Sequence, residues 1–181
     1  IDKQQASFKT RIGREINLYA LITMAKKDTW KALSAFKKVQ NKFTVDERSY
    51  FYSKLGLVAA KRHEPEATIW FQKADIETMN DEQVSWYARA TLRQRNWASL
   101  LMIIEKMPPA VADEARWRYW KARALIARQR HDEATGILTN LAVERHYYGW
   151  LSQDEIKNYK PAPLLHYKPT KKEINDIGRA N

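Results

Sequence analysis

Apolar residues recur every three or four positions along most of the chain, which is the pattern of amphipathic helices. The first stripe comprises Ile16, Tyr19, Ala20, Leu21 and Met24, and the next comprises Ala32, Leu33, Phe36 and Val39. The same periodicity continues almost to residue 150. We therefore predict a series of short helices, mostly three to five turns long, that turn their apolar faces to a shared core.

Interruptions in the apolar pattern separate these helices from one another. They fall at residues 27–29, 41–44, 63–65, 79–81, 95–97, 107–109 and 130–132. Capping boxes, in which a Ser or Thr is followed three residues later by Glu, mark several helix starts. We expect them at Thr44 with Glu47, Ser152 with Glu155 and Thr170 with Glu173, with a variant at Asn80 and Gln83.

Small residues recur behind the tight turns at a nearly constant interval. Positions 32, 67, 99 and 134 are separated by about 35, 32 and 35 residues, close to the period of helix-turn-helix repeats. A small residue allows the two antiparallel helices of a pair to approach closely. The pattern predicts an all-α, right-handed superhelix of antiparallel helix pairs, a tetratricopeptide-like α-solenoid arc, with an irregular helical bundle as the alternative.

The last part of the chain differs from the repeats. Residues 159–169 contain three prolines, which cannot continue a helix. We expect a helical-repeat domain over 1–158, a Pro-rich connector over 159–169, and over 170–181 the start of a helix that continues in a longer parent chain.

The composition supports a helical fold and limits the chemistry. Only 5 Gly and 6 Pro occur in 181 residues, and the absence of Cys excludes disulfides and thiolate metal sites. No apolar run approaches the roughly 20 residues of a membrane span. The net charge is +11, and residues 1–45 hold ten basic against three acidic side chains. Such a surface attracts polyanions of several kinds or simply keeps the protein in solution.

No catalytic or cofactor motif is visible. The four His residues have no partner at metal-ligand spacing, so we expect no metal and no cofactor. Neighbouring carboxylates, among them Asp132/Glu133 and Asp154/Glu155, lie near predicted helix starts, where the helix dipole explains them. Nothing isolates an acid in an apolar pocket as a glycosidase requires. We therefore expect this chain itself to be inactive.

Aromatic residues form the densest unusual feature, and helical spacing places most of them in the core. Trp117 and Trp120 share one helical face, with Arg116, Lys121 and Arg123 beside it. These five residues are the candidates for a mixed aromatic and basic binding surface.

The segments Trp117-Arg118-Tyr119-Trp120-Lys121-Ala122-Arg123-Ala124-Leu125, Asp132-Glu133-Ala134 with Leu138, and Tyr147-Tyr148-Gly149 resemble the late superhelical region of soluble lytic murein transglycosylases. The resemblance extends over roughly residues 16 to 160. Beyond Gly149 the chain departs from the small-residue helix that is usual in the family. The Glu-Ser and Gly-Leu-Met-Gln motifs of the family's catalytic domain do not occur, so the resemblance assigns no catalytic residue.

The resemblance implies a periplasmic arc of helices that helps to position peptidoglycan glycan strands for a catalytic domain of the same parent chain. That parent would cleave murein without hydrolysis, forming a 1,6-anhydro product. Two other readings remain open from the residues alone. One is a helical-repeat scaffold for a protein partner, and the other, less favoured because the turn positions show no repeated polar code, is a basic module that binds nucleic acid.

Overall fold

The computed structural model describes residues 6–156 and 170–171, and its regular elements in that part of the chain are all helical. The elements are α1 (Arg11–Ala25), α2 (Thr29–Lys37), η1 (Gln40–Lys42), α3 (Val45–Lys61), α4 (Ala67–Phe71), η2 (Ile76–Thr78), α5 (Asp81–Arg93), α6 (Trp97–Glu105), α7 (Pro109–Ala112), α8 (Ala115–Ala127), α9 (His131–Ala142) and α10 (Tyr147–Glu155). The predicted all-α class is confirmed.

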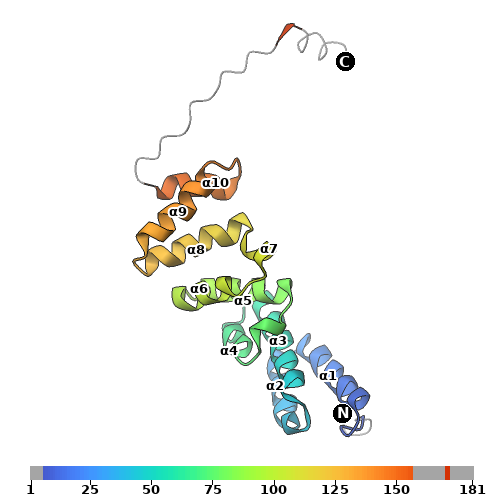
Figure 1. Cartoon of the computed structure of the whole chain (residues 1–181). Helices are drawn as coiled ribbons and strands as arrows, with labels where there is room; N and C mark the ends of the chain where they lie inside the picture. The colour runs from blue at the N-terminus through green and yellow to red at the C-terminus, as the bar shows by residue number, and fades with distance from the viewer. Residues whose placement is uncertain (1–5, 157–169, 172–181) are drawn as a thin grey trace.

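The helices follow one another along a curved stack, with α1 and α2 at one end and α9 and α10 at the other (Figure 1). Consecutive helices pack as the pairs α1/α2, α3/α4, α5/α6 and α8/α9. The first helices of neighbouring pairs also contact each other, α1 with α3 and α3 with α5, and α10 then packs on α8 and α9. Each pair buries its apolar face on the next pair, which is the construction of an α-solenoid.

The repeat predicted from the small residues is present in the packing. Ala32, Ala67 and Ala134 lie in the first turn of the second helices of three pairs and are at most 1% exposed. In α6 the predicted Ser99 is partly exposed, and the buried residue at the place of Ala32 and Ala134, four positions after the N-cap, is Leu100. A larger side chain at these positions would hold the paired helices apart. The interval near 35 residues therefore reflects one structural unit per helix pair.

Three of the turns between paired helices have the same backbone conformation. His63, Arg95 and Gln129 have φ values of 64°, 53° and 61°, in the left-handed region that glycine adopts more readily. The following amide in each case donates to the carbonyl five residues back, as Glu64 N does to Ala59 O at 2.9 Å. This is the Schellman pattern, and here it ends α3, α5 and α8 without a glycine.

Glycine at these three positions should stabilise the protein. Because a side chain disfavours positive φ, we expect His63→Gly, Arg95→Gly and Gln129→Gly each to raise the free energy of unfolding by about 0.5–1 kcal/mol. Lys27→Gly in the α1/α2 turn is the matched control, since Lys27 does not have positive φ, and it should be neutral or destabilising. Thermal unfolding of the four variants measures this, and equal effects at all four positions would contradict it.

Two predicted capping boxes are confirmed and one is wrong. Thr44 with Glu47 starts α3, and Asn80 with Gln83 starts α5, each with both reciprocal hydrogen bonds. Ser152 instead lies inside α10, fully buried, and its hydroxyl donates to Tyr148 O. The reason is that α10 begins earlier, at Tyr147, where the His146 side chain caps it.

Predictions for the end of the chain lie largely outside the described residues. This is so for the Pro-rich connector over 159–169, for the capping box at Thr170 and Glu173, and for the helix over 170–181 except its first two residues. The predicted domain boundaries stay predictions.

The apolar stripe predicted for α1 is only partly correct. Leu21 is buried as predicted, but Ile16 and Tyr19 are 54% and 72% exposed, and Leu18 and Ala25 complete the buried face. The core takes only the face that meets α2 and α3, and α1 has no preceding helix pair among the described residues to cover its other apolar side chains.

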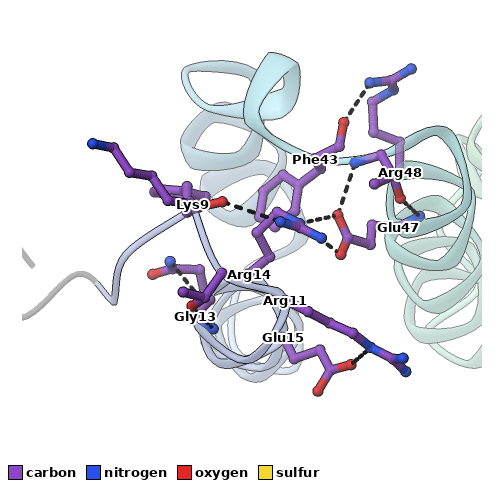
Figure 2. Close-up of polar contacts among 12 residues, drawn as sticks. Lys9, Arg11, Gly13, Arg14, Glu15, Phe43, Glu47 and Arg48 are labelled. Atoms are coloured by element: carbon purple, nitrogen blue, oxygen red, sulfur yellow. Dashed lines mark hydrogen bonds and ion pairs between the residues drawn. The ribbon is translucent and has the colours of Figure 1, made fainter.

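The first and second pairs are joined by a partly buried ion pair. Arg14 on α1 contacts both carboxylate oxygens of Glu47, from Nε at 2.9 and 3.0 Å, and its Nη1 donates to Phe8 O (Figure 2). Burial opposes ionisation of Glu47, but hydrogen bonds from the Thr44 amide and from Arg14 outweigh it and lower the pKa of this carboxyl. One carboxylate thus caps α3 and fixes α1 against it.

Candidate functional site

Helix α8 carries the five predicted surface residues, and the structure separates them into three groups. Arg116, Trp120 and Arg123 are partly exposed and recur every three or four residues, so they share one face. Trp117 points into the core, and Lys121 lies on another side of the helix. Only the first group can form a common surface.

Trp117 is 1% exposed and has its ring among the largest fully buried side chains. It cannot offer a ring face to a glycan. The prediction that Trp117 contacts a ligand is therefore wrong, because its side chain fills space in the hydrophobic core. Its position still matters, because the guanidinium groups of Arg89 and Arg116 lie 5.5 and 5.7 Å from its ring centre.

Lys121 lines a different hollow, with Arg118 of the same helix and with residues of α6, α7 and α9. Lys121 follows Trp120 directly and precedes Arg123 by two positions, and this spacing places it on a different side of the helix from both. It therefore does not take part in the surface formed by Arg116 and Trp120.

Arg123 is engaged within the protein. Its Nη1 donates to Tyr119 Oη at 3.0 Å and pairs with Glu155 of α10. The carboxylate predicted to start a helix at Glu155 instead lies at the end of α10, where this ion pair ties it to α8. The contact neutralises Arg123 and leaves it less available to a ligand than Arg116.

Two residues of α5 complete the surface and were missed from the sequence. Trp86 and Arg89 are three positions apart, and the Arg89 guanidinium lies 5.1 Å from the Trp86 ring centre. Arg89 is thus held between Trp86 and the buried Trp117, beside Arg116, by cation–π contacts. The spacing of Trp86 and Arg89 was visible in the sequence, but their meeting with α8 depends on how the pairs stack.

The electrostatics of this surface, formed by Trp86, Arg89, Arg116 and Trp120, are unusual. Burial, reinforced by the like charge of Arg116, lowers the pKa of Arg89, and Glu114 opposes the shift only partly. Arg116 pairs with Glu114. Arg116 Nε and Trp117 Nε1 are buried donors that have no acceptor within the described residues. Positive charge and unused N–H donors are therefore concentrated where the aromatic rings gather.

A second network holds α10 in place beside this surface. Arg118 donates to both oxygens of Glu144, at 2.7 and 3.0 Å, and His146 Nε2 lies 2.6 Å from the same carboxylate. His146 Nδ1 accepts from Gly149 N, which leaves the Nε2 proton to donate to Glu144. The hydrogen bonds from Arg118 and His146 lower the pKa of Glu144 from 4.5 to about 2.

This network predicts a pH dependence of stability. The folded-state pKa of Glu144 lies below its unfolded value, so its contribution is complete above pH 4.5 and is lost as the pH falls toward 2. Glu144→Gln should lower the free energy of unfolding at pH 7 by about 1 kcal/mol, and the deficit should shrink at acid pH. Glu133→Gln, which breaks an exposed pair with Arg130, should change little. Urea unfolding between pH 2.5 and 7 tests this, and a deficit independent of pH would contradict it.

A further aromatic groove lies at the other end of the stack. Tyr19 and Tyr50, 72% and 48% exposed, line the space between α1 and α3. Lys26, Lys54 and Arg62 lie along the same groove, which accounts for part of the positive charge of the amino-terminal third. Sequence periodicity had placed Tyr19 in the core and so concealed this surface.

Neither a metal-ligand cluster nor a membrane-spanning helix is found among the described residues. Over residues 6–156 and 170–171, no group of three His, Cys, Asp or Glu side chains is arranged to hold a metal ion. In the same ranges no helix has the length and apolar character to cross a membrane.

Comparison with known proteins finds no matching family model and no matching curated sequence. Solved structures do match. Lytic transglycosylase Slt from Pseudomonas aeruginosa, determined as an inactive mutant, superposes with a TM-score of 0.69 and 29% identity over 81% of this chain and 24% of that protein. The 70 kDa soluble lytic transglycosylase Slt70 from Escherichia coli matches with a TM-score of 0.64 and 19% identity over 84% of this chain and 25% of that protein. At this identity the match is evidence for a shared fold only.

The chain thus spans about a quarter of the length of both structures. The part of this chain that matches is the α-solenoid of helix pairs described above. The family resemblance predicted from the sequence is confirmed: over about four fifths of its length this chain is similar to lytic transglycosylase Slt.

Proposed function

We propose that this chain is the non-catalytic superhelical part of a periplasmic lytic transglycosylase, and that it positions peptidoglycan glycan strands for a catalytic domain of the same parent chain. The observation that carries the proposal is the match to Slt at 29% identity and a TM-score of 0.69. The match covers 24% of that protein's length.

The chemistry of the surface supports this role. Trp86 and Trp120 are partly exposed on α5 and α8, and indole faces pack well on the C–H faces of sugar rings. Arg89 and Arg116 beside them supply donors for hydroxyl, acetamido and carboxylate oxygens. A row of such contacts along stacked helices can follow an extended polymer, because a solenoid presents equivalent positions of successive pairs on one side.

Co-sedimentation with insoluble murein sacculi tests the proposal. We expect the purified protein to sediment with sacculi at physiological and raised salt and in the presence of competing RNA. Charge attraction alone would be screened by salt, whereas stacking and hydrogen bonding persist. Absence of sedimentation, or its loss on addition of salt or RNA, would contradict the proposal and favour a protein scaffold or a nucleic-acid module.

A pair of matched variants locates the effect. Trp120→Ala on α8 should reduce sedimentation severalfold. Trp30→Ala removes an indole that is 55% exposed on α2, in the row of second helices, and should leave binding unchanged. Equal losses in both variants would mean that aromatic residues in general hold the protein on murein, and not the surface on α5 and α8.

A further inference from the structure

The surface described above contains an arginine pair whose charge is not balanced by the protein. Arg89 makes no ion pair or hydrogen bond within the described residues, and Arg116 pairs with Glu114 alone. Tyr148 of α10 also lies within electrostatic reach of Arg89, but as a phenol it adds no charge at neutral pH. Two guanidinium groups and one carboxylate leave a single positive charge, held beside Trp117.

The two arginines reach the same part of the protein from different helices. Both guanidinium groups lie within 5.7 Å of the same Trp117 ring, one from α5 and one from α8. Arg116 Nε and Trp117 Nε1 are buried N–H groups without an acceptor in residues 6–156. Both atoms are shielded from solvent, so a strand would meet the partly exposed guanidinium groups of Arg89 and Arg116 and not these two donors.

The geometry points to a carboxylate as the ligand, and we propose that Arg89 and Arg116 bind the carboxylate carried by muramic-acid units of the glycan strand. This inference rests on the proposed function. A carboxylate carries the one negative charge that the pair lacks, and its two oxygens accept the parallel N–H bonds of a guanidinium fork. Trp86 contacts Arg89, and Trp120 lies one helical turn after Arg116, so both indoles can pack on neighbouring sugars.

Two sources can supply this carboxylate. A strand whose stem peptides have been removed exposes the lactyl carboxylate of muramic acid, and an intact strand carries the carboxylates of its stem peptides. The two share the same charge and the same acceptor geometry. Chitooligosaccharides have a similar backbone but no carboxylate, which makes them the neutral control.

The first test observes the two side chains directly. In ¹H–¹⁵N spectra, the Nε–Hε signals of Arg89 and Arg116, identified with Arg89→Gln and Arg116→Gln, should shift on addition of N-acetylmuramic acid or of a stem-bearing disaccharide. N-acetylglucosamine should leave them in place. Equal shifts with N-acetylglucosamine, no shift with either acid, or larger shifts with an RNA oligonucleotide at the same concentration would overturn the carboxylate site.

The second test measures affinity for soluble strands. We expect Arg89→Gln to weaken binding of stem-bearing strands, stripped strands or both by roughly tenfold, the loss of one charge-assisted contact, and to leave chitooligosaccharide binding unchanged. The source whose affinity falls is the carboxylate that is bound. Arg89→Lys should not restore it, because an ammonium lacks the planar fork. Arg145→Gln removes the same charge from an exposed loop and serves as the control; a loss equal to that of Arg89→Gln would overturn the site.

The two proposals fail in different ways. If strands bind but Arg89→Gln binds as well as the unchanged protein, the carboxylate site is wrong and the positioning role stands. If the arginine signals shift with N-acetylmuramic acid while no strand binds, the site stands and the positioning role is wrong.

Discussion

Replacing Gly149 by alanine should destabilise the protein by about 3 kcal/mol, although it adds a single methyl group. A Cβ at this position would lie 2.0 Å from Glu144 O and 2.9 Å from Leu141 O. Both are backbone atoms, one in the last turn of α9 and one in the tight reversal before α10, so neither can rotate away as a side-chain end could. The chain would have to separate α10 from α9 and give up the Gly149 N bond to His146.

Gly136→Ala is the matched control for this prediction. Gly136 lies in α9 with nothing within 4 Å of its hypothetical Cβ, and alanine has the higher helix propensity, so this variant should gain up to about 1 kcal/mol. Urea or thermal unfolding of the two variants measures the contrast. A Gly149→Ala variant as stable as the unchanged protein would show that α9 and α10 do not approach this closely.

Replacing Trp117 by alanine should cost about 3–5 kcal/mol, the range for a large aromatic residue removed from a well-packed core. The side chain is 1% exposed and packs where α8 meets the preceding helix pair. Its removal would leave a cavity inside the core, which exposed side chains cannot fill. Trp150→Ala, which removes an indole that is 59% exposed, should change stability by no more than about 0.5 kcal/mol.

The variant Trp117→Phe refines this prediction. It keeps an aromatic ring next to the two arginines and removes Nε1, a buried donor without an acceptor in the described residues. Its cost should therefore be well below that of the alanine variant, since no hydrogen bond is lost. If the alanine variant unfolds no more easily than Trp150→Ala, Trp117 is not the core residue described above.

The organisation of the helix pairs was predictable from the sequence because it depends on local signals. Apolar periodicity and the capping at Thr44 and Asn80 are properties of neighbouring residues, and the alanines at 32, 67 and 134 repeat one such local pattern; the structure contains all of them. The errors arose where a helix has an uncovered side. Nothing in a single sequence says that Ile16 and Tyr19 meet no partner helix, since amphipathicity alone does not say what covers the apolar face.

The candidate surface was predictable only in part for the same reason. The sequence indicated that α8 carries Arg116 and Trp120, but not that Trp117 would be taken by the core. Arg89 lies 27 positions before Arg116 in the chain, and the two come together only because α8 stacks on the α5/α6 pair, chiefly against α6. Charge balance, which distinguishes Arg89 from the paired Arg123, depends on contacts with α10 that no local pattern encodes.

The most direct measurement of the central claim is hydroxyl-radical footprinting of the tryptophans with and without soluble peptidoglycan strands. If the arc positions strands along α5 and α8, oxidation of Trp86 and Trp120 falls when strands are added, while oxidation of Trp30, exposed on α2, is unchanged. Unchanged oxidation of Trp86 and Trp120 at strand concentrations that saturate binding would contradict the account, as would protection of Trp30 alone.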